Sequence, residues 1–426
     1  MSEYLIEGGR RLFGECVIQG AKNSALPVLA ATLLCDGRCN IYNCPDILDV
    51  DATLNILKHL GCKTERNGSC VTVDSRGADG YEIPEPLMRE MRSSVIFLGA
   101  ILAKNKKVRL STPGGCEIGL RPIDLHLDAM KKMGARISDE FGFIEVECPD
   151  GLTGTAVSLS FPSVGATENI IIAASTAKGT TTIINAAREP EISDLADYLN
   201  ACGAKISGAG QGTVTIEGVK RLYPSSHSVI PDRIAAATYM CAVAVTGGRA
   251  EFRNVIPAHI GPVIELLEET GCDINIASRS VTVESSGELK GIQMLRTMPY
   301  PGFPTDIQAP VVAMLTKARG TSVMIETIFE NRFKYIGELV RFGAKIRVDG
   351  RMAVVEGVRT LHGANVITPD LRGGAALIVA GLGSEGTTVI RDIKHILRGY
   401  ECPEKVLSSL SGNIKRIEND GSEKSE

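Results

Sequence analysis

Hydrophobic and polar positions follow one pattern that recurs six times along the chain, with a period of about 70 residues. Each copy begins with an apolar helix of small residues and continues with a short strand, an amphipathic helix and a β-hairpin. A period this long is too great for a solenoid of short repeats, so the pattern predicts six copies of one supersecondary unit. A glycine-containing phrase ends the second helix of each copy, at residues 61–63, 134–136, 203–205, 271–273, 343–345 and 412–413.

The first helix of each copy is hydrophobic around most of its circumference, which is typical of a helix packed inside its domain. The second helices, such as 123–133 and 192–199, carry charges between spaced apolar residues, so we expect them to lie outside. The first helices are expected at residues 23–34, 92–102, 166–177, 233–245, 306–316 and 372–382.

Turn signals place a hairpin after the second helix of a unit. Asn67-Gly68 separates predicted strands at 62–65 and 70–73. Asp349-Gly350 stands in the same way between strands at 345–348 and 352–355. Both dipeptides favour a type I′ turn, in which the two central residues have positive φ.

The fold class predicted from these elements is α/β, with sheets outside and the first helices of three units inside each domain. A chain of 426 residues is long for a single core, so two domains are expected. We assign residues 22–229 to one domain and residues 1–21 and 230–417 to the second. Residues 418–426 are charged and are expected to form a flexible tail.

Two segments are expected to connect the domains. The polar stretch Tyr223–Ser228 follows the third unit and is the predicted linker. A second crossing is expected near Gly20, because the opening strand at 4–7 has no unit of its own.

Composition narrows the possible functions. A net charge of −4, no tryptophan and an aromatic content of 4% argue against a nucleic-acid binder. The N-terminus has early acids and no apolar run, and the stretch 375–382 is far shorter than the roughly 20 residues of a membrane span. We therefore expect a cytoplasmic protein without membrane insertion, which holds a small polar ligand by hydrogen bonds and charge.

The twelve cysteines lack the paired spacing of a metal site, so we expect no metal and no cofactor. Eleven of them are interpreted as small buried hydrophobes or bystanders. Cys116 differs, because it lies in the glycine-rich stretch Pro113–Pro122 close to Arg121, whose charge favours the thiolate. Since one copy alone has such a loop, we assign the repeat to architecture and Cys116 to chemistry, as an acid or trapping nucleophile.

Charged residues stand at the starts of the buried helices, where burial alone gives no reason for them. A helix N-terminus binds anions, and Lys22 at such a start opposes the helix dipole and must be offset by an anion. If the helices of each domain point toward the other domain, these charges meet in a cleft between the domains. Together with Lys22, five arginines at element starts or in loops resemble a clamp for a phosphate- and carboxylate-bearing ligand: Arg92, Arg121, Arg332, Arg372 and Arg398.

Two further segments have candidate chemistry. Asp306 follows the rigid lead-in Phe303–Pro304, which suits a positioned carboxylate acting as a general base. Ser163–Gly165 is either a plain helix lead-in or a place where a diphosphate approaches the backbone at Gly165.

At these motifs the sequence resembles the UDP-N-acetylglucosamine 1-carboxyvinyltransferase family, the enolpyruvyl transferases of peptidoglycan synthesis. The resemblance extends from about residue 4 to residue 417 and implies two inverse α/β domains, each of three repeated units, that close over the substrates. The motifs that carry it are Gly20–Ser24, Pro113–Leu125, Phe161–Asn169, Arg188–Ile192, Ile230–Arg233, Pro301–Asp306, Phe329–Phe333, Asp370–Arg372 and Arg398–Glu401.

The resemblance also implies a reaction and residue roles. Phosphoenolpyruvate transfers its enolpyruvyl group to the 3-hydroxyl of UDP-N-acetylglucosamine and releases phosphate, by addition and then elimination. Carried over by motif, Cys116 is the proton donor and covalent trap, Asp306 is the base, and phosphoenolpyruvate is held by Lys22, Arg121 and Arg398. The residues implied for the nucleotide sugar are Asn23, Arg92, Arg121, Pro122, Ile123, Asp124, Leu125, Ser163, Val164, Gly165, Asp306 and Ile328, and those implied for the charged intermediate and the closed state are Arg332, Asp370 and Arg372.

The sequence departs from the family at Leu397, where an acidic residue usually precedes the arginine and would orient it. Two alternatives stay open. A shikimate-pathway enolpyruvyl transferase shares the fold and the co-substrate, but the Cys116 loop and the segment Ser163–Thr167 argue against it. A catalytically weakened duplicate that binds the nucleotide sugar and regulates wall synthesis is favoured by Leu397 alone.

We predict that Cys116 is the cysteine alkylated fastest, because the thiolate is the nucleophile and Arg121 favours that form. An anionic epoxide should label it, and faster with UDP-N-acetylglucosamine present. Peptide mapping by mass spectrometry checks this, and a label found mainly on another cysteine would contradict it. Cys116→Ser should lose turnover, whereas Cys116→Asp should retain part of it, because a carboxylic acid also donates a proton.

Overall fold

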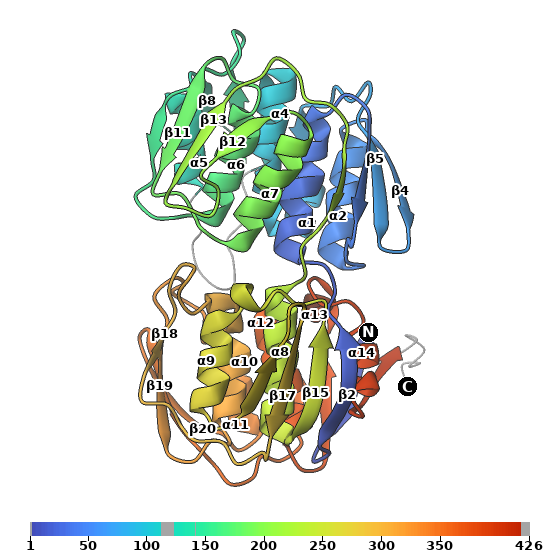
Figure 1. Cartoon of the computed structure of the whole chain (residues 1–426), viewed down its shortest axis with the longest axis vertical. Coiled ribbons are helices and arrows are strands. Elements are labelled where there is room, and N and C mark those ends of the chain that lie inside the picture. Colours follow the sequence, from blue (N-terminus) through green and yellow to red (C-terminus); the bar gives the residue numbers. More distant parts are fainter. Residues whose placement is uncertain (1, 112–122, 141, 419–426) are drawn as a thin grey trace, which may run out of the picture. The chain divides into compact units, whose positions relative to one another are not determined.

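The computed structural model describes residues 2–111, 123–140 and 142–418, which form two compact units. Unit 1 comprises the described residues of 1–19 and 231–426, and unit 2 those of 20–115 and 121–230 (Figure 1). The Cys116 loop and the predicted flexible tail after Glu418 lie outside the described residues.

The strands of unit 2 form three four-stranded sheets within the described ranges. In each sheet the first two strands are parallel and the other pairs are antiparallel. The sheets are β14(Ser226–Ser228)-β3(Arg38–Tyr42)-β5(Cys70–Asp74)-β4(Lys63–Asn67), β6(Glu82–Ile83)-β7(Lys107–Ser111)-β9(Phe143–Glu147)-β8(Arg136–Glu140) and β10(Ala156–Ser158)-β11(Thr180–Ile184)-β13(Thr213–Glu217)-β12(Lys205–Ser207).

Unit 1 repeats this arrangement with three sheets of its own across the described part of the chain. They are β2(Leu12–Val17)-β15(Gly248–Arg253)-β17(Ser280–Ser285)-β16(Asp273–Ile276), β18(Leu295–Arg296)-β19(Thr321–Ile325)-β21(Met352–Glu356)-β20(Lys345–Asp349) and β22(Asn365–Ile367)-β23(Thr387–Arg391)-β1(Ser2–Glu7)-β24(Asn413–Glu418). Six sheets for six sequence repeats match the predicted supersecondary units.

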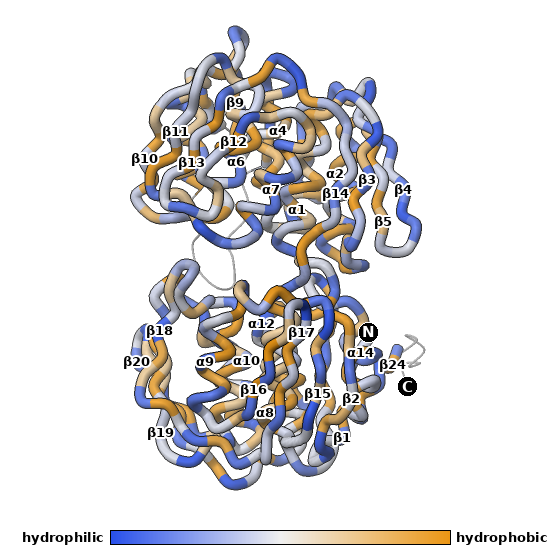
Figure 2. Tube along the Cα trace, in the orientation of Figure 1, coloured by the Kyte–Doolittle hydropathy of each residue, from blue (hydrophilic) through white to orange (hydrophobic). Residues whose placement is uncertain are grey.

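Each unit encloses the apolar helices predicted from the sequence. In unit 1 these are α8(Arg233–Thr246), α10(Thr305–Leu315) and α12(Leu371–Gly383), which pack against one another pairwise. In unit 2 they are α1(Lys22–Ala31), α4(Phe97–Asn105), which the 3₁₀ helix η2(Arg92–Ile96) precedes, and α6(Val164–Ala174). Small and branched apolar side chains cover these helices, so nearly all of their residues are buried in one core per unit. Figure 2 shows the hydrophobic residues concentrated on inner helices such as α10.

The remaining helices connect the sheets. The second helices of the repeats are α2(Leu48–His59), α5(Asp124–Lys132), α7(Pro190–Ala201), α9(Gly261–Glu269), α11(Ile336–Arg341) and α14(Pro403–Ser409). The short ones are η1(Thr32–Leu34), α3(Glu85–Glu90), η3(Pro257–His259) and α13(Lys394–Leu397). Charged residues of α5 and α9 are exposed as predicted, and α7 packs one face against α1 while Asp197 and Asn200 on its other face are exposed. No helix in the described ranges is long and apolar enough to cross a membrane.

The crossing predicted near Gly20 is confirmed by the boundary between residues 19 and 20, but the predicted linker and the reason given for that crossing are wrong. Ser226–Ser228 of the predicted linker form β14, which pairs in parallel with β3 and places His227 opposite Ile41. The opening strand β1 does have a unit, because it lies between β23 and β24 and completes the sixth sheet. The two ends of the chain therefore close the last repeat together.

The hairpins form where they were predicted, but their loops lie one residue later. Asn67 pairs with Cys70 and Asp349 pairs with Met352, so the loops are 68–69 and 350–351. Gly68 and Gly350 have φ of 58° and 54°, whereas neither second loop residue has positive φ. The predicted type I′ turn, which needs positive φ at both positions, is therefore wrong.

An asparagine joins the two parallel strands in three of the sheets. It follows the second strand directly, has positive φ, and donates its side-chain amide to the carbonyl of the residue after the edge strand. We call this arrangement the strand clasp. Its donor and acceptor pairs are Asn43 with Val229, Asn185 with Leu159 and Asn254 with Ile18, at 2.8, 2.9 and 2.8 Å.

We predict that Asn185→Ala destabilises the protein by about 2 kcal/mol, because it removes the clasp bond and leaves a Cβ at positive φ. Asn185→Gly should cost about half of that, since glycine tolerates this backbone conformation. Urea unfolding of both variants checks the ranking. Equal losses for the two variants would show that the backbone conformation contributes nothing.

Candidate functional site

Asp306 lies in the first turn of α10 between two buried arginines of unit 1. Its Oδ1 atom is 2.8 Å from Nη2 of Arg332 and 3.3 Å from Nε of Arg372. Arg332 and Arg372 expose only 4% and 6% of their side chains, whereas Asp306 exposes 29%. Buried guanidinium groups require such pairing, and the exposed part of the carboxylate remains accessible to a reactant.

Arg372 extends the polar network into the core. Its Nη1 donates to Tyr400 Oη at 3.3 Å, and that oxygen lies 2.9 Å from Thr238 Oγ1. Burial lowers the pKa of the Arg372 guanidinium, but the carboxylate of Asp306 and the hydroxyl of Tyr400 outweigh it and raise the pKa above its usual range. Arg372 is therefore a permanent cation beside Asp306.

Asp370 caps α12, the helix that carries Arg372. Its Oδ1 accepts hydrogen bonds from the backbone N–H groups of Arg372 and Gly373, each at 2.9 Å. Its Oδ2 is buried and has no hydrogen-bond partner among the residues that the structure describes. Asp370 therefore fixes the start of the helix with Oδ1, and its Oδ2 can accept a hydrogen bond from a bound ligand.

Gln19 holds the segment that follows Arg398. Its Nε2 donates to the carbonyl of Gly399 at 3.1 Å, and its Oε1 accepts from the N–H of Glu401 at 2.8 Å. Leu397, which replaces the usual acid, is half-buried and packs against the core of unit 1. The backbone at Arg398 is thus fixed by an amide that the sequence analysis missed, because the contact spans 380 residues.

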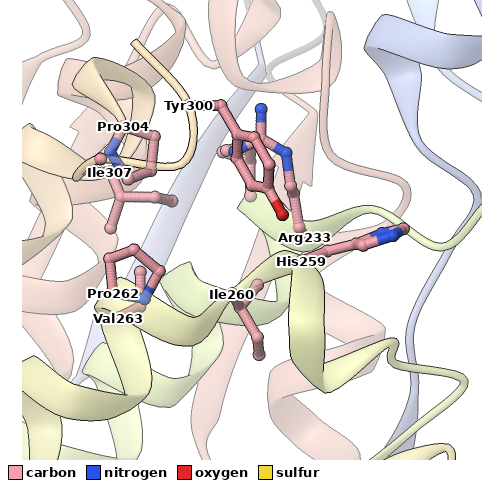
Figure 3. A pocket seen from close by; sticks show the side chains of 10 residues that line it. Arg233, His259, Ile260, Pro262, Val263, Tyr300, Pro304 and Ile307 are labelled. Carbon is pink, nitrogen blue, oxygen red and sulfur yellow. The ribbon is translucent and has the colours of Figure 1, made fainter. Parts of the chain in front are cut away.

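Tyr300 fastens the lead-in to Asp306 (Figure 3). Its hydroxyl donates to the carbonyl of Ala258 at 3.2 Å, and the guanidinium of Arg233 lies 5.7 Å from the centre of its ring. A shallow pocket that is partly open to solvent lies here and reaches Pro304 and Ile307 on either side of Asp306. Tyr300 therefore fixes the segment just before the predicted lead-in.

Lys22 begins α1 in unit 2, with its ammonium 2.5 Å from Oδ2 of Asp49. Both side chains are buried, at 10% and 1% exposure. The sequence analysis required an anion to offset a lysine at a helix N-terminus, and this carboxylate supplies one within the protein. Sequence reasoning missed Asp49, which looks like an ordinary acid in the first turn of α2.

A second buried acid fixes the turn that follows Lys22 and Asn23. Asp194 of α7 accepts a hydrogen bond from Ser24 and lies 2.9 Å from Nε2 of His227 in β14. It also accepts from the N–H of Ile230 at 3.4 Å. Asp194 therefore joins the start of α1 to the segment with which unit 2 ends.

Ser163 caps α6, as its Oγ accepts from the N–H of Ala166 at 3.3 Å. Val164 and Gly165 form the first residues of that helix, and a Cβ at Gly165 would lie 3.2 Å from the ring of His126. Glycine at 165 thus makes room for an imidazole, a role that the sequence analysis did not consider.

His126 is fixed by Asn169. The side-chain carbonyl of Asn169 accepts from the N–H of Gly99 at 2.7 Å, which leaves its amide nitrogen 2.8 Å from Nδ1 of His126. Burial lowers the pKa of His126 to about 4, so its ring is neutral near pH 7. The ring packs between the starts of α5 and α6, two elements that carry predicted site residues.

The structure brings part of the predicted set together within each unit. Asp306, Arg332 and Arg372 are in contact. Ile328 lies in the loop that follows β19, and its N–H donates to Oε1 of Glu326 at 2.8 Å. The predicted site residues that the structure describes in unit 2 all lie at or beside the starts of helices. They are Lys22, Asn23, Arg92, Ile123, Asp124, Leu125, Ser163, Val164 and Gly165. Cys116, Arg121 and Pro122 lie outside the described residues.

Nine of the eleven cysteines in the described ranges are buried, and Cys70 and Cys402 are half-buried. This confirms their interpretation as packing residues. Cys35, Cys39 and Cys202 gather around Tyr198, with Cys35 Sγ 3.7 Å from its hydroxyl.

Comparisons with known proteins agree with this fold. The family model of EPSP synthase (3-phosphoshikimate 1-carboxyvinyltransferase) matches residues 6–407. UDP-N-acetylglucosamine 1-carboxyvinyltransferase 2 of Caldanaerobacter subterraneus subsp. tengcongensis is 50% identical over 417 residues, which cover 98% of this chain and 100% of the relative. UDP-N-acetylglucosamine 1-carboxyvinyltransferase 1 of Symbiobacterium thermophilum is 49% identical over 419 residues, covering 97% and 95%. The crystal structure of the enolpyruvyl transferase NikO from Streptomyces tendae superposes with a TM-score of 0.88 at 26% identity, covering 97% and 98%.

We predict that His126 makes stability depend on pH between about 6.5 and 4. Its pKa is lowered on folding, so the unfolded chain binds the proton first and the free energy of unfolding falls as the pH falls through this window. The loss approaches about 3 kcal/mol at pH 4. Urea unfolding of the wild type and of His126→Gln at pH 7 and pH 4.5 checks this: the wild type should lose more stability than the variant. Equal losses would contradict the assignment.

Proposed function

The chain belongs to the UDP-N-acetylglucosamine 1-carboxyvinyltransferase family, and on that premise we propose that it transfers the enolpyruvyl group of phosphoenolpyruvate to the 3-hydroxyl of UDP-N-acetylglucosamine. Phosphate is the second product, and the reaction commits the sugar to peptidoglycan synthesis. The observation that carries this proposal is the carboxylate of Asp306, partly exposed at the start of a buried helix and held by two arginines.

Asp306 is the proposed base. As the sugar oxygen attacks C2 of phosphoenolpyruvate, the carboxylate takes the hydroxyl proton, and C3 gains a proton from Cys116. Arg332 and Arg372 offset the negative charge around this step. Elimination then breaks the bond from C2 to the phosphate oxygen. The C3 proton returns to the Cys116 thiolate and the leaving phosphate takes the proton held by Asp306, so the C2–C3 double bond is restored in the enol ether product.

Charged residues are proposed to hold the substrates. Lys22 and Arg398, with Arg121, are the proposed ligands of phosphoenolpyruvate, which has a phosphate and a carboxylate to pair with them. Asp49 holds the ammonium of Lys22 in place at the start of α1. The nucleotide sugar is proposed to contact Asn23, Arg92, Pro122, Ile123, Asp124, Leu125, Ser163, Val164, Gly165 and Ile328. Asp370, whose second carboxylate oxygen is buried, is proposed to stabilise the charged intermediate with Arg332 and Arg372.

The weakened-duplicate alternative rests on Leu397 alone. In the family an acid at this position would orient the arginine that follows it. Here Gln19 bonds the backbone of Gly399 and Glu401, and Leu397 packs against the core instead. The segment that follows the arginine is therefore fixed without an acid at 397, which favours the active enzyme. Both substrates are small soluble anions, so we place the reaction in the cytoplasm.

We predict that the wild-type protein releases phosphate from phosphoenolpyruvate with UDP-N-acetylglucosamine and not with shikimate 3-phosphate. Asp306→Asn should lower kcat by about 10²–10⁴-fold, because an amide cannot take the proton. Asp349→Asn, in an exposed hairpin of the same unit, is the matched control and should leave kcat unchanged. A continuous phosphate assay and circular dichroism check activity and folding. Nucleotide-sugar binding without phosphate release would overturn the enzyme in favour of the regulatory duplicate.

A further inference from the structure

Glu326 occupies the strand-clasp position of the sheet β18-β19-β21-β20, whose edge strand β18 precedes Asp306 in the chain. It directly follows β19, as Asn43, Asn185 and Asn254 follow the equivalent strands of three other sheets. Those asparagines have positive φ, and Asp392, which follows β23, shares that conformation, but Glu326 does not. In this repeat the clasp residue has therefore been replaced by a longer acid with a different backbone conformation.

The clasp itself is retained without Glu326. The acceptor equivalent to Val229, Leu159 and Ile18 is the carbonyl of Thr297, which follows the edge strand β18. The hydroxyl of Thr327 donates to this carbonyl at 2.6 Å. Since Thr327 already joins the two strand ends, joining them does not account for the carboxylate of Glu326.

The carboxylate of Glu326 instead collects four hydrogen bonds from three segments. Oε2 accepts from the hydroxyl of Thr305 at 2.9 Å. Oε1 accepts from the hydroxyl of Thr297 at 3.0 Å and from the N–H groups of Ile328 and Phe329 at 2.8 and 3.1 Å. Glu326 is 1% exposed, so it cannot itself contact a substrate.

These partners adjoin the proposed site. Thr305 precedes Asp306, and its carbonyl accepts from Nη2 of Arg332 at 3.3 Å, the same nitrogen that pairs with Asp306. Ile328 is a proposed contact of the nucleotide sugar. We propose that Glu326 is a positioning residue. Its carboxylate fixes the start of α10, which carries Asp306, relative to the loop that carries Ile328. This inference rests on the proposed function.

A carboxylate suits this task better than its amide. All four partners are donors, and an ionised carboxylate offers acceptors alone. A glutamine can keep its oxygen on the backbone N–H groups of 328 and 329 only by turning its NH₂ group toward Thr305, whose hydroxyl must then accept instead of donate. The three donors on Oε1 would then face a neutral amide oxygen, which is a weaker acceptor than a carboxylate. An asparagine, as in the other sheets, is shorter by one methylene and reaches fewer of these donors.

Glu326→Gln tests the inference, with Thr327→Val as the matched control that removes the clasp and keeps the carboxylate. We expect Glu326→Gln to lower kcat by about 10–100-fold and to raise KM for UDP-N-acetylglucosamine severalfold, as misplacement of reacting groups does. Thr327→Val should lower the melting temperature while kcat stays within about twofold of the wild type. Equal losses of kcat in the two variants would overturn the proposal, since they would show a general structural effect.

The same substitution in an Asp306→Asn background separates positioning from stability. If Glu326 acts through Asp306, Glu326→Gln should change the residual kcat of Asp306→Asn by less than about twofold. A further loss as large as in the wild type would overturn the proposal. If the wild type releases no phosphate, the proposed function fails. Calorimetric titration with UDP-N-acetylglucosamine then tests the role of Glu326 at Ile328 separately. Weaker binding in Glu326→Gln than in Thr327→Val would still support the role at Ile328, and unchanged binding would remove it.

Discussion

A helix that is surrounded by protein can carry charged groups only near its ends, and this constraint places the candidate site. Sheets form the outside of each unit, and helices such as α8, α10 and α12 are buried along their length. Their polar residues therefore gather in the first turn, where free N–H groups also favour anions. Asp306 and the cap Asp370 both follow this rule. The fold thus limits the chemistry to the helix starts before any particular residue is considered.

Charges at such positions must offset one another. Arg332 and Arg372 are almost fully buried, and a buried guanidinium without an anion would cost several kcal/mol. Asp306 meets this need in unit 1, and Asp49 does the same for Lys22 in unit 2. The groups proposed to act on the substrates therefore also keep one another folded in place. Substitutions here are expected to affect stability and activity together, which is why matched controls are needed.

The sequence predicted the parts of this structure that depend on local patterns. Continuous apolar runs identified the six buried helices, and turn residues located the hairpins to within one residue. Family motifs supplied the candidate site residues, several of which lie at helix starts. Contacts between distant segments leave no periodic signal, so Gln19 against Gly399 and Asp194 against Ser24 were missed. The strand β14 was missed because three polar residues are too few to show an alternation.

Glu326 differs from the asparagines at the equivalent position of three other sheets. A residue type that recurs at this position serves the fold, whereas a residue that differs from its equivalents serves its own site.

The central claim, that the helix starts form the substrate site, is tested most directly by a crystal structure with UDP-N-acetylglucosamine and phosphoenolpyruvate bound to Asp306→Asn. The account predicts the sugar hydroxyl beside residue 306 and the phosphates at Lys22, Arg398 and the start of α6. Substrates seated on an outer sheet face, away from these starts, would contradict it.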